Sequence, residues 1–415
     1  MATTEPPAGA NPPPTGIREA ATVLTATTGA LTFSATTALF PAAIAPAIAD
    51  AMGVSPSLIG VQISLLYLGA MITSLVGGGI ARRLGACRTT QWAVAIFGMG
   101  GLLAAAANLW VFLAASLLIG FGYGLTNPAA SHLLVRFTDP RRRGLVFGLK
   151  QTGVPLGGVI AGALAPLLAV NYGWQAAMAA LSVPAIAAIA LLQWPRARWD
   201  EDRQPRARWL AAPLEDIRLV WSIPPMRKAA MASFCFSTTQ LCLTVFTVTL
   251  LVEDLSIGLI TAGGIMALVQ ISGVAGRIGW GWVADRTGNS RATLGVVGGL
   301  AAAFAGAVTL MRGDWPIWLI TMVLCGFAAV ALGWNGVYLA EITHLAPRDQ
   351  IARASGGSLV ITFGGVLFGP AAFTAIHGVI GDYTTTFAAV ALSSLVGAWL
   401  AISSGRRGGH ANVAQ

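Results

Sequence analysis

The chain is a succession of long apolar stretches separated by short polar gaps, and this pattern constrains its fold more than any other feature. About twelve stretches reach the ~20 mostly apolar residues that a helix needs to cross a lipid bilayer. They run at roughly 22–48, 58–80, 89–107, 110–135, 145–169, 174–193, 229–251, 258–282, 292–311, 315–343, 354–376 and 383–403. The sequence therefore predicts an all-α membrane protein with about 12 transmembrane helices.

The charge content supports the same class of protein. Only 10% of the residues are charged and 55% are hydrophobic, whereas a soluble protein of this length needs a charged surface. The net charge of +9 could suggest a nucleic acid partner, but the arginines are confined to short gaps between apolar stretches. We therefore expect the lipid bilayer as the surrounding partner, and no nucleic acid.

The distribution of charge between the gaps predicts the orientation in the membrane. Every second gap is rich in arginine: Arg82, Arg83, Arg88, Arg136, Arg141, Arg142, Arg143, Arg286, Arg291, Arg348 and Arg353. The alternate gaps carry Asp50, Glu253, Asp254, Asp314 and Asp382, with Arg312 as their cation. Loops rich in Lys and Arg stay in the cytoplasm. We therefore expect a multi-pass protein of the cell inner (plasma) membrane, with both termini cytoplasmic.

Two similar segments divide the chain into halves. Gly78–Gly85 and Gly281–Gly288 each close an apolar stretch and are followed by Arg88 and Arg291. Internal repeats of this kind occur in secondary transporters, whose binding sites lie where the halves meet. The expected organisation is a disordered tail over 1–20, a six-helix bundle over 21–193, a cytoplasmic linker over 194–228, a second six-helix bundle over 229–403 and a tail over 404–415.

The second segment carries a family resemblance. Residues 281–291, Gly-Trp-Val-Ala-Asp-Arg-Thr-Gly-Asn-Ser-Arg, resemble the loop motif of the major facilitator superfamily of secondary transporters. Residues 153–158, Gly-Val-Pro-Leu-Gly-Gly, are similar to a motif often associated with its antiporters. The resemblance implies two pseudo-symmetric bundles, the major facilitator fold, that rock about a midplane site. It also implies that Asp285 with Arg286 helps close the cytoplasmic side, whereas Arg82 replaces that acid in the first half.

Two cations lie inside predicted spans and are candidates for substrate binding. A charge within the bilayer is costly and marks a functional candidate by default. Arg277 lies eight residues before Asp285, and Lys150 lies at a similar depth in the other half. Facing one cavity, they would attract an anion and could bind its carboxylate. Alternatively, Arg277 pairs with a carbonyl or a helix end, and Lys150 extends to the cytoplasmic interface.

A second resemblance narrows the expected substrate. The pattern from Arg277 through Gly281 to Asp285 resembles span eight of monocarboxylate transporters, and oxalate:formate exchangers also have a basic residue in that span. It implies a small organic anion, a monocarboxylate or a related carboxylate. Some monocarboxylate carriers place a proton-handling acid one turn earlier, where this chain has Gly273. A coupling proton, if there is one, must therefore use another group.

Further polar side chains could complete the site and its gates. The other substrate-binding candidates are Tyr123, Asn127, Gln151, Asn335, Tyr67 and Gln270, of which Asn127 and Asn335 are related by the repeat. Four residues near the cytoplasmic span ends could form a gate of reorganising ion pairs: His132, Arg136, Glu341 and Arg353. His132 and Arg136 lie one turn apart, and Glu341 is expected near His344 and Arg353. A solvated salt bridge is the simpler alternative for them.

Other functions fit the residues less well. A drug or metabolite:proton antiporter (an efflux pump) is the main alternative. It would be expected to have an acidic residue in its cavity, which the spans lack. The arginine common in such exporters would fall near Ser116, where this chain has no charged residue. An integral membrane enzyme lacks support, because there is no His-Glu-x-x-His pair, nucleophile–base pair or membrane carboxylate pair. We therefore expect no enzyme activity, no cofactor and no metal site, and a protein that functions as a monomer.

Overall fold

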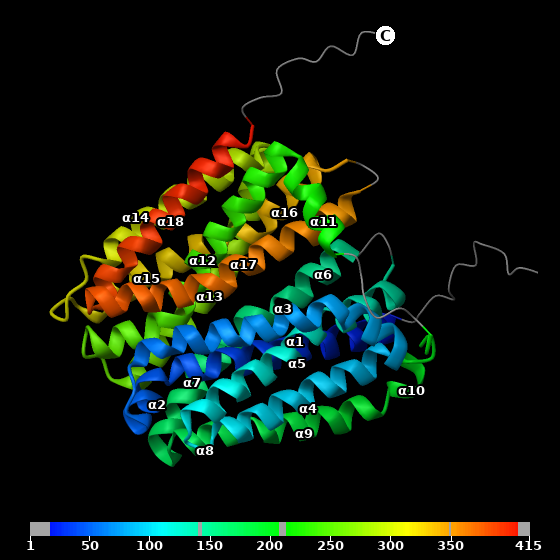
Figure 1. Cartoon of the computed structure of the whole chain (residues 1–415), viewed down its shortest axis with the longest axis horizontal. Coiled ribbons are helices and arrows are strands. Elements are labelled where there is room, and N and C mark those ends of the chain that lie inside the picture. Colours follow the sequence, from blue (N-terminus) through cyan, green and yellow to red (C-terminus); the bar gives the residue numbers. More distant parts are fainter. Residues whose placement is uncertain (1–16, 140–142, 207–212, 348–349, 406–415) are drawn as a thin grey trace, which may run out of the picture.

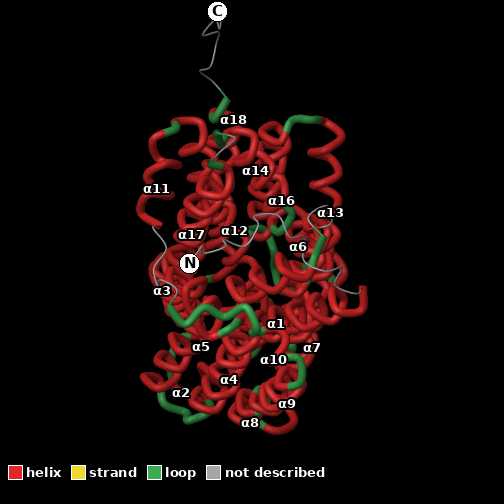
Figure 2. The backbone as a smooth tube through the Cα atoms, turned by 90° about the vertical axis from the view of Figure 1, so that its right-hand side faces the viewer, coloured by secondary structure: helices red, strands yellow, loops and turns green. Residues whose placement is uncertain are grey.

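The computed structural model describes residues 17–139, 143–206, 213–347 and 350–405. Within these ranges the backbone forms helices and connecting loops without a β-strand (Figure 2). Arg141, Arg142 and Arg348, which contributed to the predicted orientation, lie outside the described residues, as do most of both predicted tails. The first helix begins at Ile17, so the last residues of the tail predicted over 1–20 are helical.

The first half is built from nine α-helices and one short 3-10 helix within the described ranges. They are α1 (Ile17–Ala43), α2 (Ala45–Met52), the 3-10 helix η1 (Pro56–Leu58), α3 (Ile59–Leu84), α4 (Ala86–Ala104), α5 (Leu109–Phe137), α6 (Arg143–Gln151), α7 (Gly153–Tyr172), α8 (Trp174–Ala179) and α9 (Ser182–Gln193). Pro46 lies in the first turn of α2, where its missing backbone N–H is tolerated because the N–H groups of the first turn have no partner within the helix. The first predicted span is therefore divided into α1 and α2.

The linker and the second half follow. They contain α10 (Arg196–Trp199), α11 (Pro213–Ser222), α12 (Pro224–Glu253), α13 (Leu259–Thr287), α14 (Ser290–Val308), α15 (Ile317–Ala331), α16 (Trp334–Leu345), α17 (Ile351–Ile380) and α18 (Tyr383–Ser403). Eleven segments of the described chain are long and apolar enough to cross a membrane. The remaining span is α4, whose first turns carry Arg88 and Gln91 and are less apolar. The predicted fold class, about twelve membrane helices in two bundles, is confirmed.

The two halves lie side by side and meet along two pairs of helices. In Figure 1 the helices of the first half, blue to green-cyan, lie below those of the second half. Most of the contact between the halves is made by α3 with α17 and by α7 with α13, and α12 adds contacts with α1 and α3. We call the end of the bundle that holds α10, the α3–α4 turn and the α13–α14 turn the linker end. The opposite end, with η1 and the α12–α13 loop, is the far end.

Glycine permits close contact between the halves toward the far end. A Cβ atom on Gly263 of α13 would lie 2.3 Å from the carbonyl oxygen of Gly162 on α7, and one on Gly60 of α3 would lie 2.5 Å from that of Pro370 on α17. Thr374 adds a hydrogen bond of 2.7 Å from its hydroxyl to the carbonyl oxygen of Ser57. Small residues let membrane helices pack this closely. The structure is therefore closed between the halves at the far end.

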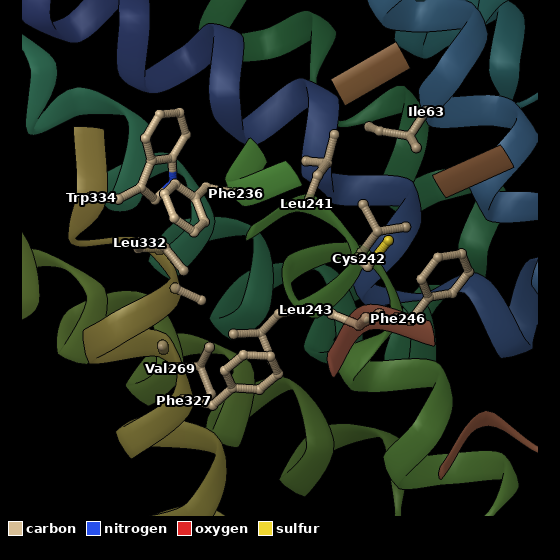
Figure 3. Packing of buried hydrophobic residues seen from close by; sticks show 14 of the residues in the cluster. Ile63, Phe236, Leu241, Cys242, Leu243, Phe246, Val269, Phe327, Leu332 and Trp334 are labelled. Carbon is tan, nitrogen blue, oxygen red and sulfur yellow. The ribbon is translucent and has the colours of Figure 1, made fainter. Parts of the chain in front are cut away.

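Apolar packing continues from one half into the other around α12. Ile63 of α3 belongs to the same buried cluster as Cys242 and Phe246 of α12, and Figure 3 shows these side chains close to one another. Phe246 also stacks on Phe373 of α17, with ring centroids 4.1 Å apart. Cys87, Cys235 and Cys242 are buried free thiols.

A pair of neighbouring glycines tests this interface. We expect Gly263→Ala to lower the thermal unfolding temperature of the purified protein, because its methyl group would collide with the backbone of α7; overpacking of this kind costs about 1–3 kcal/mol. The matched control is Gly264→Ala, where a Cβ atom meets nothing within 4 Å and alanine favours the helix. Equal unfolding temperatures for the two variants would contradict the interface.

Candidate functional site

Arg277 is held by the buried C-terminal end of a broken helix. The tenth predicted span is interrupted between α15 and α16, and the carbonyl oxygen of Leu332, just after α15, is released from regular helix pairing. Arg277 on α13 donates from Nε to this oxygen over 3.1 Å. A helix C-terminus carries partial negative charge, which favours a cation. The structure thus shows the alternative interpretation for Nε, which pairs with a carbonyl oxygen at a helix end.

The rest of the Arg277 guanidinium remains available for a ligand. A guanidinium has five N–H donors, and its terminal nitrogens suit both oxygens of a carboxylate. Among the described residues, the hydrogen bond to Leu332 uses Nε and leaves the two terminal nitrogens without another hydrogen-bond acceptor. The side chain is partly exposed. Pairing with the carbonyl therefore orients Arg277 and does not exclude an anion.

Asn335 and Gln240 stabilise the same helix break. The Gln240 side-chain oxygen accepts hydrogen bonds of 3.0 Å from Trp334 Nε1 and of 3.0 Å from Asn335 Nδ2. Asn335 also donates to the carbonyl oxygen of Leu332 over 3.3 Å, so this oxygen is shared with Arg277. Asn335 thereby fixes the geometry around Arg277 from the neighbouring helix.

Lys150 is buried in the first half. Its side chain is only 2% exposed, and Nζ donates a hydrogen bond to the side-chain oxygen of Asn127 on α5. The described structure therefore differs from the alternative in which Lys150 extends to the interface. Because Asn127 and Asn335 are related by the repeat, each half pairs an asparagine with a cation: directly in the first half, and through Leu332 in the second.

The two predicted tyrosines pack against each other in the first half. Tyr67 and Tyr123 lie edge to face with ring centroids 5.5 Å apart, and Tyr123 is 8% exposed. Tyr123 lies near Arg277 of the other half. The tyrosine pair therefore extends from the first half toward the cation of the second.

The two predicted glutamines have different environments. Gln270 of α13 is 2% exposed and lies against α7, where a Cβ atom on Gly158 would be 2.6 Å from the Gln270 side chain. Gln151, the last residue of α6, is exposed. Burial between the halves distinguishes Gln270 from Gln151, which the sequence pattern alone treated alike.

His132 and Arg136 bind the linker rather than the second half in the described structure. His132 Nε2 lies 2.8 Å from a carboxylate oxygen of Asp202. Arg136 lies 2.8 Å from the other oxygen of Asp202 and 3.3 Å from Glu201. The beginning of the linker, residues 196–204, is therefore fastened to α5 instead of forming a free connection.

A further linker acid stabilises the start of α4. Asp200 accepts hydrogen bonds from the backbone N–H of Cys87, at 2.7 Å, and of Arg88, at 3.0 Å. These are the unpaired donors that an N-terminal cap satisfies. Burial raises the pKa of Asp200 above its ordinary value, although the two amides act in the opposite direction. Asp200 could not be identified from the sequence, because a cap supplied from so far along the chain has no local signal.

The remaining gate candidates have partners that the sequence did not indicate. Glu341 is 6% exposed and pairs with Arg291 at 3.5 Å, and His344, expected near it, lines the same pocket. Arg353 Nε lies 2.9 Å from Asp216 of α11. These partners have a spatial cause: the α13–α14 turn brings Arg291 beside α16, while α11 packs along α17.

The loop-motif residues Asp285 and Arg286 are exposed in this structure. The guanidinium of Arg286 lies 5.3 Å from the ring centroid of Trp282. Their predicted part in closing the linker end remains a prediction, since the halves contact each other here toward the far end. Within the described ranges no three His, Cys, Asp or Glu side chains come together as a metal site would require.

Two helical bundles with buried polar and cationic side chains are an arrangement typical of membrane transport proteins. The chain belongs to the Major Facilitator Superfamily, whose family model matches residues 25–357. It is accordingly a transporter and not an enzyme. The family resemblance inferred from the loop motif is confirmed.

Several relatives carry organic acids. The chain is 29% identical to a gallate transporter of Pseudomonas putida, covering 79% of this chain and 78% of the relative. It is 28% identical to the 4-hydroxybenzoate transporter PcaK of the same species, over 77% and 78%. It is also 28% identical to the 3-(3-hydroxy-phenyl)propionate transporter of Escherichia coli (strain K12), over 78% of each chain.

Solved structures support the fold. A bacterial homolog of the human lysosomal transporter Spinster, inward-facing and unoccupied, superposes with a TM-score of 0.75 at 15% identity, covering 94% of this chain and 97% of that one. A D-xylose-proton symporter gives a TM-score of 0.73 at 14% identity, over 93% and 97%.

Proposed function

We propose that the protein is a secondary transporter of a small organic anion, a monocarboxylate whose carboxylate is attached to an aromatic group. The observation that carries this proposal is the presence of Arg277 and the buried Lys150 in opposite halves. Gallate, 4-hydroxybenzoate and 3-(3-hydroxyphenyl)propionate, after which three relatives are named, are all aromatic carboxylates.

The proposed binding mode assigns the carboxylate to the two cations. The terminal nitrogens of Arg277 bind its oxygens, and Lys150 contributes positive charge from the first half. Tyr67 and Tyr123 present aromatic faces and edges, which pack favourably on a substrate ring. Asn127 and Asn335 hold the cations in position. Gln151 is the weakest of the predicted contacts, because its side chain is exposed.

The transport cycle proposed here is alternating access by rocking of the two halves. The contacts at Gly60, Gly162 and Thr374 close the far end in the described state and would separate in the opposite state. Asp285, Arg286 and the Glu341–Arg291 pair would then take part in closing the linker end. By the positive-inside pattern the linker end faces the cytoplasm, and the membrane is the inner membrane of the cell. One chain contains both halves, so it can act as a monomer.

Uptake into proteoliposomes tests the substrate class. Labelled 4-hydroxybenzoate should enter vesicles that contain the protein, with saturation, and unlabelled benzoate should compete. The uncharged amide of 4-hydroxybenzoate should compete at least about tenfold less well, because it lacks the charge that binds Arg277. An imposed pH gradient separates proton-coupled transport from exchange or uniport. Transport of cationic dyes without transport of carboxylates would instead support the efflux-pump alternative.

A further inference from the structure

Gln270 has an unusual position within the contact between the halves. It lies on α13 eleven residues after Leu259, the first residue of that helix, and therefore about 16 Å along the helix axis. This depth is near the middle of a hydrocarbon core about 30 Å thick. Its side chain crosses toward α7, because Gly158 there has no side chain to exclude it.

The amide of Gln270 lacks the partner that such burial normally requires. Among the described residues its Nε2 atom has no hydrogen-bond acceptor, although the side chain is 2% exposed. A buried donor without an acceptor is destabilising, because it has lost its hydrogen bonds to water. The described closed contact is therefore less stable than it would be with an oxygen atom beside Nε2.

Gln270 also lies on the same face of α13 as Arg277. Seven residues are two turns of an α-helix, so their Cα atoms are about 10 Å apart along the axis. Two hydrogen bonds of about 2.9 Å each, with an aromatic ring between them, span slightly more than this separation, which the two side chains can accommodate by pointing slightly apart. Tyr123, which lies near Arg277, belongs to the facing half.

We propose that Gln270 is a specificity-determining residue that donates a hydrogen bond to a ring hydroxyl oxygen of the substrate, at the end opposite the carboxylate bound by Arg277. This inference rests on the proposed function and extends it to hydroxylated aromatic carboxylates. The hydroxyl oxygen supplies the acceptor that Nε2 lacks when the halves close. Closure with a hydroxylated substrate is then more favourable than closure without one.

The test compares 4-hydroxybenzoate with benzoate in wild-type protein and in Gln270→Leu, which keeps similar bulk but removes the amide. We expect wild-type kcat/KM to favour 4-hydroxybenzoate by about tenfold, the effect of one hydrogen bond to a buried donor. Gln270→Leu should reduce this ratio to about one while benzoate uptake is retained. Gln270→Asn, whose amide is one methylene shorter, should give an intermediate ratio. The matched control is Gln175→Leu, an exposed glutamine on α8.

A second readout does not depend on turnover. 4-Hydroxybenzoate should raise the thermal unfolding temperature of wild-type protein more than benzoate does, and the two acids should raise that of Gln270→Leu equally. An unchanged preference in Gln270→Leu overturns the role of Gln270 while leaving the proposed function intact. An equal loss of uptake for both acids in a folded Gln270→Leu protein also overturns the role of Gln270, since an equal loss indicates a structural role. If wild-type protein neither transports nor is stabilised by either acid, the proposed function itself fails.

Discussion

Replacing Arg277 by alanine is expected to lower kcat/KM for carboxylate uptake by about 100-fold or more. A hydrogen bond between charged groups contributes about 1.5–3 kcal/mol, and each 1.4 kcal/mol is about tenfold in affinity. The proposed substrate would lose the charged donors that bind its two oxygens. Initial rates of labelled 4-hydroxybenzoate uptake into proteoliposomes measure the effect.

Two variants separate charge from geometry at this position. Arg277→Lys keeps the positive charge but loses the planar fork, and we expect it to recover only part of the activity. Arg312→Ala removes an exposed arginine at the far end and serves as the control for lost charge. Wild-type uptake by a folded Arg277→Ala protein would exclude Arg277 as the carboxylate ligand.

Replacing Lys150 by methionine is expected to raise KM for the carboxylate by about 10- to 100-fold, with a smaller effect on the stability of the protein. Methionine occupies a similar volume but removes the buried ammonium group, which contributes to binding a negative charge. Asn127 would lose its hydrogen-bond donor in this variant. Concentration-dependent uptake gives KM, and thermal unfolding reports whether the fold is retained.

A double variant asks whether Lys150 and Arg277 act on one ligand. Residues that bind the same group show a coupling energy, whereas distant and independent residues have additive effects. The loss in Lys150→Met combined with Arg277→Ala should therefore be clearly smaller than the product of the two single losses. Strict additivity would argue for two separate anion sites. Lys228, which bonds to the carbonyl oxygen of Ser403, provides the matched Lys228→Met control.

The membrane fold was predictable because it depends on properties that are local in the sequence. A helix must be apolar over the thickness of the bilayer, so span positions could be read from hydropathy. The spans were nevertheless treated as continuous, and the structure interrupts the tenth between α15 and α16. Neither Leu332 nor Gly333 has a sequence signal strong enough to predict that break, yet it supplies the carbonyl oxygen that holds Arg277.

The candidate site could be predicted by residue type but not by partner. Burying a charge is costly, which is why Lys150 and Arg277 were identifiable from the sequence. Their hydrogen bonds to Asn127 and Leu332 depend on which helices become neighbours. The expected proximity of Glu341 and Arg353 illustrates the limit, because closeness in sequence around one loop did not identify Arg291 as the ion-pair partner.

The sequence by itself determined the class of fold, the repeat that divides it, the family and the cations available for an anion. Hydropathy, charge distribution and motifs are properties of short segments, and they do not depend on which other segments lie nearby in the fold. Only the tertiary structure decided that residues 196–204 are fastened to the first bundle, that Glu341 pairs with Arg291, and that Gln270 is buried against Gly158 with no acceptor for Nε2 among the described residues. These are contacts between helices far apart in the chain, and their energies depend on packing and burial that exist only once the two halves have met.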